Sequence, residues 1–101
     1  MGKLLDINQE LVKRCQEGDN EAFRILYGVT SKVVYNTIIR LLKNSDDTKD
    51  ILQETYTTAF KTIDSIQSSN ALISWLRKIA VNKSLNHLKK KQLSHQIDNL
   101  L

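Results

Sequence analysis

A compact acidic and amide face is predicted on a helix in the middle of the chain. The stretch from Ser45 to Phe60 begins as helices do: Ser45 can cap it, and Asp46 and Asp47 stand in the first turn, where the helix dipole favours negative charge. Apolar residues of this stretch recur on one side at helical spacing. The opposite face is either solvated surface or a docking surface for a basic partner, and the pattern alone leaves both open. That face carries Asp50, Gln53, Glu54, Thr57 and Lys61.

A second set of polar side chains occupies the last third of the chain. A short polar loop precedes a helix with an aromatic, lysines and amides on one side. Amides can read base edges, lysines can hold phosphates, and an aromatic ring can stack on an unpaired base. The structural alternatives are a core position for Trp75 and helix-to-helix hydrogen bonds for Asn82 and Asn86. Besides these three residues, the helix side carries Lys78 and Lys89.

No arrangement in the sequence is typical of catalysis or metal binding. His87 and His95 are eight residues apart, too far to chelate one metal from a helix, and Cys15 is remote from both. There is no glycine-rich phosphate loop and no serine between glycines. We therefore expect neither an enzyme nor a cofactor or metal site.

Charge is divided unevenly along the chain. Residues 1–60 hold eight Lys or Arg against nine Asp or Glu, whereas residues 61–101 hold seven against two. A basic C-terminal part indicates an anionic partner, most simply a nucleic acid, although lysine-rich ends can also serve solubility. A single cysteine, with no signal peptide and no long apolar run, favours a reducing, cytoplasmic location without membrane insertion.

The sequence predicts an all-α fold, a bundle of about four helices. Proline is absent, glycine occurs three times, and no long stretch alternates as strands do. Gly18 suits the end of the first helix, and Asp19 or Asn20 the start of the next. Asn70 is the expected N-cap of the last helix. The predicted elements are a lead-in over residues 1–6, helices over about 8–17, 21–43, 45–64 and 71–91, a loop over 65–70 and a tail over 92–101.

Three blocks, taken together, resemble region 2 of the bacterial sigma-70 family, and most closely its extracytoplasmic-function (ECF) subgroup. They are residues 10–23 (ELVKRCQEGDNEAF), 46–56 (DDTKDILQETY) and 75–82 (WLRKIAVN), in the family's order and spacing. The resemblance implies a module of transcription initiation that binds core RNA polymerase and recognises and melts the −10 promoter element. It assigns residues 1–91 to the region 2 domain and residues 92–101 to a tail or the start of a linker to a region 4 that is absent here.

The resemblance also implies which residues act. The family's Asp-x-x-Asp-apolar-x-Gln-Glu segment docks on the clamp helices of the largest polymerase subunit, and here it gives Asp47, Asp50, Gln53 and Glu54, with Thr57 beside them. The family reads the non-template strand of the −10 element with the loop before the fourth helix and with that helix. The corresponding residues are Ile66, Gln67, Ser68, Ser69, Asn70, Trp75, Lys78, Asn82 and Asn86. Phosphate contacts are expected from Lys78, Lys83, Lys89, Lys90 and Lys91, and Lys61 is a further predicted DNA-binding residue.

The loop departs from the family pattern, because Ile66 and Leu72 stand where aromatic residues are usual. This departure leaves the preferred bases open. Two other functions also stay open at this point. The domain could act mainly as the target of an anti-sigma factor, or it could be a helical module that reads duplex DNA. A duplex reader would prefer double-stranded probes, whereas the resemblance implies preference for a single strand.

Overall fold

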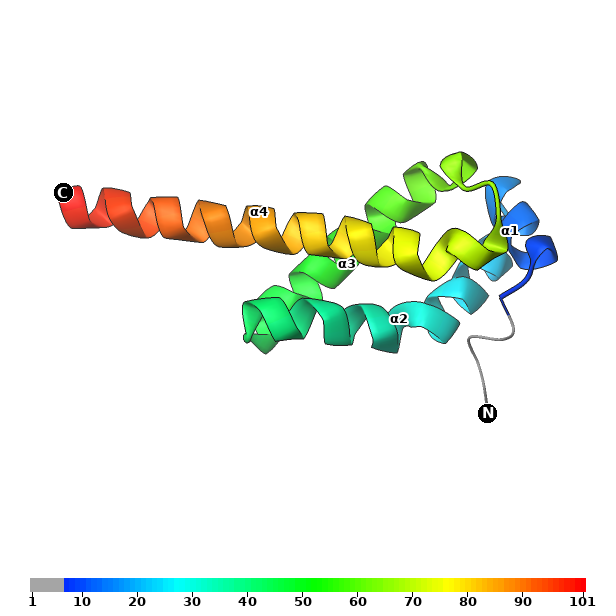
Figure 1. Cartoon of the computed structure of the whole chain (residues 1–101), viewed down its shortest axis with the longest axis horizontal. Helices are drawn as coiled ribbons and strands as arrows, with labels where there is room; N and C mark the ends of the chain where they lie inside the picture. The colour runs from blue at the N-terminus through cyan, green and yellow to red at the C-terminus, as the bar shows by residue number, and fades with distance from the viewer. Residues whose placement is uncertain (1–6) are drawn as a thin grey trace.

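A computed structural model describes residues 7–101, and within that range the chain is all α-helical, as predicted (Figure 1). The predicted lead-in over residues 1–6 lies outside the described residues. No helix within residues 7–101 combines the length and the apolar character that crossing a bilayer requires. The elements are α1 (Gln9–Gln16), α2 (Asn20–Leu42), α3 (Ser45–Lys61), the short 3₁₀ turns η2 (Ile63–Ser65) and η3 (Ser69–Ala71), and α4 (Leu72–Leu100).

The first two helices begin and end at the residues that the sequence indicated. Gly18 has a φ of +84°, so the chain leaves α1 through the left-handed region that glycine adopts without strain. The backbone N–H of Glu21 donates to the Asp19 carboxylate at 2.9 Å, which makes Asp19 the N-cap of α2. Gly28 does not interrupt α2, which runs without a break to Leu42.

Two predicted caps were wrong. The N-cap of α3 is Asn44 and not Ser45: Asn44 Oδ1 accepts from the N–H of Asp47 at 2.8 Å. Lys43 ends α2 with a φ of 54°, and Asn44 then follows in an extended conformation, so its side chain is the one that reaches the open turn. Asn70 caps nothing with its side chain, because it lies inside η3, whose cap is Ser68.

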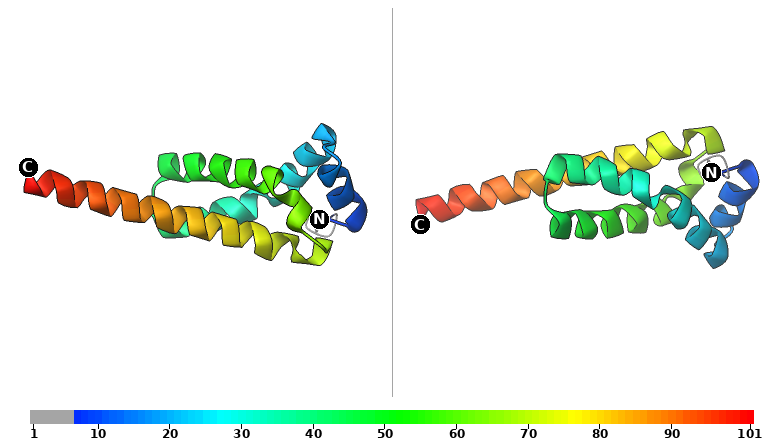
Figure 2. Two further views of the ribbon diagram at one scale, coloured as in Figure 1. Left: turned by 90° about the horizontal axis from the view of Figure 1, so that it is seen from above. Right: turned by 90° about the horizontal axis from the view of Figure 1, so that it is seen from below.

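The core forms where α2, α3 and α4 pack together, and Figure 2 shows α2 and α3 as an antiparallel pair with α4 across them. On α2 every fourth residue is fully buried, from Leu26 through Val34 to Ile38. The same spacing on α4 buries Leu72, Leu76 and Ala80. This period of four places one stripe of each helix against its neighbours, as helix packing requires.

The apolar side of α3 is also as predicted, and it includes polar atoms that are satisfied internally. Ile51, Tyr56 and Ala59 are buried. The Tyr56 hydroxyl hydrogen-bonds the buried Thr30 hydroxyl of α2. Burial raises the pKa of Tyr56 to about 12, so this phenol stays neutral at physiological pH. Cys15 is buried as expected, and burial raises the pKa of its thiol to about 11, so it packs as a small apolar residue.

The last helix is longer than predicted. The sequence placed its end near Lys91, but α4 continues to Leu100 and extends beyond the turn that joins α2 to α3 (Figure 1). No glycine or proline occurs in residues 92–100 to stop it. Its final turns expose Leu93, Ile97 and Leu100, of which Leu100 is 85% exposed.

Candidate functional site

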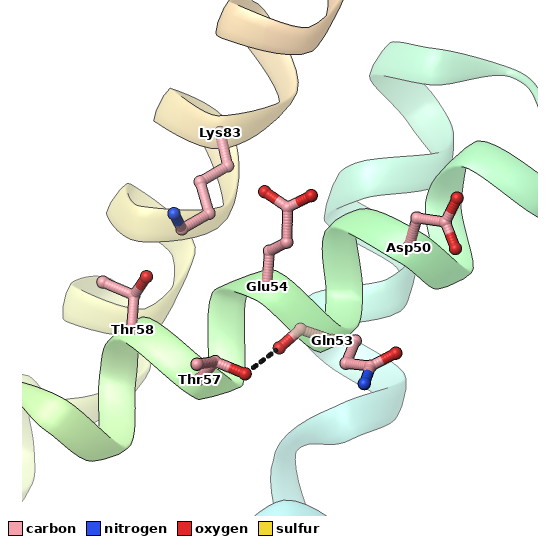
Figure 3. Close-up of a pocket in the computed structure, with 6 residues that line it drawn as sticks. All are labelled: Asp50, Gln53, Glu54, Thr57, Thr58 and Lys83. Atoms are coloured by element: carbon pink, nitrogen blue, oxygen red, sulfur yellow. Dashed lines mark hydrogen bonds between the residues drawn. The ribbon is translucent and has the colours of Figure 1, made fainter.

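The acidic and amide face of α3 is present as predicted and borders a groove beside α4. Asp50, Gln53, Glu54 and Thr57 are all exposed, on the side of α3 opposite its core residues. Their side chains line the groove together with Thr58 and, from α4, Lys83. Figure 3 shows the Glu54 carboxylate directed toward α4 and Gln53 directed away from it, with the Thr57 hydroxyl donating to the Gln53 carbonyl. Such a surface offers hydrogen-bond acceptors and the two carboxylates of Asp50 and Glu54 to a basic partner.

Asp47 lies outside this groove, although it belongs to the same sequence motif. Its carboxylate accepts a hydrogen bond from Lys91 Nζ at 2.9 Å, and His87 Nε2 lies 3.3 Å from the same oxygen. The Lys91 bond, followed by the His87 contact, lowers the pKa of Asp47. Asp47 is two turns before Glu54 on the side of α3 that faces α4, so its charge joins the start of α3 to the final helix.

Lys83 lines the α3 groove and is absent from the hollow that Asn82, Asn86 and Lys89 share. Its side chain runs along α4, with the ammonium on the side of Thr58 (Figure 3). It also borders a smaller hollow with Glu54 and Asn86. Successive residues of an α-helix are rotated by about 100°, so Lys83 faces α3 whereas its neighbour Asn82 faces solvent. Its predicted role as a phosphate contact is therefore the least supported of the lysine assignments.

The remaining polar residues of α4 form a stripe along its solvent side. Lys78, Asn82, Asn86 and Lys89 are exposed, whereas Trp75 is half-buried and packs against the core. Neither Asn82 nor Asn86 hydrogen-bonds through its side chain to another residue of the described range 7–101, so the helix-to-helix alternative finds no contact to support it. Asn82, Asn86 and Lys89 line a shallow hollow with the side chains of Leu85, Leu88 and Gln92.

The loop between α3 and α4 presents polar side chains but not Ile66. Gln67 and Asn70 are exposed and Ser68 and Ser69 half-buried, whereas Ile66 is 6% exposed and belongs to the core. Because its side chain fills the core, Ile66 anchors the loop and presents no side-chain surface to DNA. Lys61 is exposed in the last turn of α3, just before the loop.

The sequence reasoning missed two glutamines of α1 that contact this loop. Gln16 Nε2 donates to the carbonyl oxygens of both Ile63 and Ile66, each at 3.0 Å. Gln9 Oε1 accepts a hydrogen bond from the backbone N–H of Ser69. The only signal was their spacing of seven residues, which places both on one side of a helix, and that pattern is common on plain surfaces.

A family model described as sigma-70 region 2 matches residues 26–93. The chain belongs to the sigma-70 region 2 family. The match includes α3, the loop and the α4 stripe, so the resemblance identified from three sequence blocks is confirmed. Within the described residues no cluster of His, Cys, Asp or Glu could hold a metal ion.

Curated relatives are ECF sigma factors. The chain is 36% identical over 81 residues to the ECF RNA polymerase sigma-E factor of Escherichia coli, and the match covers 80% of this chain and 42% of that protein. It is 35% identical over 81 residues to the sigma-E factor of Haemophilus influenzae, again with 80% and 42% covered. Identity to the sigma factor SigW of Bacillus subtilis is 29% over 87 residues, covering 86% of this chain and 46% of SigW. The chain thus spans less than half the length of these relatives.

Proposed function

We propose that this chain is the region 2 module of an ECF-type sigma factor, which docks on core RNA polymerase and captures the −10 element as a single non-template strand. The observation that carries the proposal is the exposure of two different polar surfaces on adjacent helices. The acceptor-rich groove of α3 suits a basic partner, and the amide and lysine stripe of α4 suits DNA.

In this proposal the two surfaces act in sequence. Asp50, Gln53, Glu54 and Thr57 contact the clamp helices of the largest polymerase subunit, and this contact holds α4 against the promoter. Extruding a base costs a few kcal/mol of unstacking. Stacking on a side chain, worth about 1–3 kcal/mol per base, together with hydrogen bonds to the base can offset that cost. The module therefore melts DNA only weakly alone and effectively when the polymerase positions it.

The DNA contacts divide between base reading and phosphate binding. Side chains of Gln67, Ser68, Ser69 and Asn70 surround the extruded base, and Asn82 and Asn86 read neighbouring base edges. Lys61, Lys78 and Lys89 neutralise phosphates, which makes binding fall with salt. Trp75 offers the exposed part of its ring to a base while the rest stays packed on the core. We also propose a cytoplasmic location, where core polymerase and promoter DNA are found.

The test is a double variant of the α3 groove. Changing Asp50→Ala and Glu54→Ala should weaken binding to a clamp-helix fragment of the polymerase by about tenfold to a hundredfold, because two interfacial charges are removed. Binding to single-stranded DNA should not fall. Asp64→Ala is the matched control, since Asp64 is an exposed acid outside the groove. Unchanged binding of the double variant to the fragment would show that polymerase docks elsewhere.

An anti-sigma factor covering the same surfaces stays a prediction from the resemblance. The groove variant separates the two functions when this chain and its double variant are each used to capture partners. A domain that serves mainly as an anti-sigma target would retain a small protein partner and show no measurable binding to the clamp fragment.

A further inference from the structure

The loop between α3 and α4 is held from outside by α1. The amide group of Gln16 donates to two carbonyl oxygens, those of Ile63 and Ile66, at 3.0 Å each. Two turns earlier on the same side of α1, Gln9 accepts from the N–H of Ser69. The two glutamines therefore contact the loop at both of its ends, on either side of Gln67 and Ser68.

The other hydrogen bonds of this segment are local. The N–H groups of Ser65, Ile66 and Ala71 each donate to a carbonyl three residues earlier. Ser68 Oγ accepts from the N–H of Asn70 within its own turn. Among the described residues, the side chains of Gln9 and Gln16 thus supply the hydrogen bonds that tie residues 63–71 to a distant part of the chain.

The chemistry of Gln16 fits this task closely. A primary amide carries two N–H donors on one nitrogen, and here the two acceptors are backbone carbonyls: that of Ile63, which also accepts from the N–H of Ile66, and that of Ile66. Ile66 is buried beside them, so its side chain and its carbonyl are both fixed. The next residue along the chain, Gln67, is exposed and begins the polar stretch that we assign to base reading.

We infer that Gln16 is a positioning residue for base selection: it sets the conformation in which residues 67–70 meet the extruded base. The inference rests on the proposed function of the loop. Gln16 itself lies outside the matched region 2 range, on a helix that contributes no predicted DNA contact. Its loss should therefore broaden the choice of base while leaving the lysines and the α3 groove intact.

The test uses two substitutions of Gln16 with opposite expectations. Gln16→Glu keeps the shape but replaces the donors by oxygens that the two carbonyls repel, so the loop should lose its anchor. Gln16→Lys keeps a donor on a slightly longer stem and should preserve most of the function. Lys13→Gln is the matched control, because Lys13 is exposed on the same helix and its replacement changes the net charge by the same amount as Gln16→Glu.

The full chain bound to core polymerase is first used to select its preferred sequence from random single-stranded DNA. The ratio of Kd values for single-base variants over the preferred strand then measures selectivity, and amide hydrogen exchange of residues 67–70 measures loop order. Gln16→Glu should reduce the ratio about fivefold to tenfold and speed exchange, with Gln16→Lys and Lys13→Gln close to the original.

The possible failures are distinguishable. If the original chain shows no base preference, the proposed function of the loop is wrong, whereas the exchange data still report whether Gln16 orders it. If Gln16→Glu speeds exchange but keeps the selectivity ratio, Gln16 is structural and the positioning role is wrong. If exchange does not change at all, Gln16 does not hold the loop and the inference also fails.

Discussion

The α3 groove and the proposed DNA-facing surface, which is the loop over residues 67–70 with the polar stripe of α4, are built in different ways. Five of the six groove residues come from one stretch of α3, residues 50–58, so the helical period places them together. The proposed DNA-facing surface combines a loop, the solvent side of α4 and a support from α1. A surface carried by one helix depends on local structure, whereas a composite surface depends on how three segments pack. The second should therefore be more sensitive to distant substitutions.

The largest effect that separates these two regions is expected at Asn82. Asn82→Ala should weaken binding to the preferred −10 strand by about fivefold to twentyfold, because a side-chain amide that reads a base edge is worth about 1–3 kcal/mol. Binding to unrelated single strands should change less than twofold, and binding to the clamp-helix fragment should not change. Fluorescence anisotropy with labelled strands measures all three.

Asn36→Ala is the matched control for Asn82, because Asn36 is an exposed asparagine in the middle of α2. It removes the same helix-disfavouring side chain without touching α4. Equal loss of affinity on every DNA sequence would make Asn82 a general contact and not a reader of bases. An effect of Asn36→Ala as large as that of Asn82→Ala would mean that helix stability accounts for both.

The helices and the acidic and amide face of α3 could be predicted from the sequence because both depend on local signals. The periodic apolar residues predicted which side of α3 is buried, and Gly18 and Asp19 predicted the boundary between α1 and α2. The family motif, by contrast, grouped Asp47 with Asp50, although the Asp47 carboxylate is paired with Lys91 and lies outside the groove. A shared motif does not guarantee a shared contact.

Features that depend on tertiary packing could not be predicted in this way. Ile66 was assigned to the reading loop, yet its side chain is in the core. Gln16 carried no signal beyond its spacing from Gln9, because the carbonyls that it binds lie 47 and 50 residues away in the sequence. The extension of α4 to Leu100 was missed because an exposed helix needs no apolar partner stripe to continue.

A smaller difference in DNA affinity is expected between Lys83 and Lys89, two lysines of α4 that were both predicted to contact phosphates. Lys89→Ala should reduce DNA affinity about twofold to fourfold and lower the salt slope of binding by about one, as the loss of one phosphate contact does. Lys83→Ala should leave that slope unchanged, because Lys83 lies over the α3 groove. It should instead strengthen binding to the clamp-helix fragment about twofold, since a positive charge leaves an acceptor-rich surface.

The same salt titration shows which region Lys83 serves. Each variant removes one positive charge from the same helix, so the effect of net charge cancels between them. A lower salt slope for Lys83→Ala would mean that Lys83 contacts DNA and belongs to the proposed DNA-facing surface. It would also mean that the groove and the DNA-facing surface overlap at this position.

The smallest effect is expected at Asp47, which joins the start of α3 to the C-terminal part of α4. Asp47 has a lowered pKa in the folded chain, so its contact with Lys91 and His87 stabilises the fold above the ordinary carboxyl pKa of about 3.9 and is lost as pH falls through the lower folded value. Asp47→Asn should lower Tm at pH 7 by about 3 °C or less, because the contact is partly exposed. The difference in Tm between the two proteins should shrink as pH falls below the ordinary carboxyl pKa, because the original carboxylate then becomes protonated as well.

Asp46→Asn is the control that isolates this contact. Asp46 is exposed in the same first turn of α3 and shares the favourable helix dipole, but it lies outside the contact with Lys91 and His87. If both variants lower Tm equally at pH 7, the helix dipole explains the effect and the bridge to α4 contributes nothing. If only Asp47→Asn does so, Asp47 holds the start of the α4 extension. It should then also affect clamp binding less than the Asp50→Ala and Glu54→Ala pair, because its carboxylate faces α4 and not the groove.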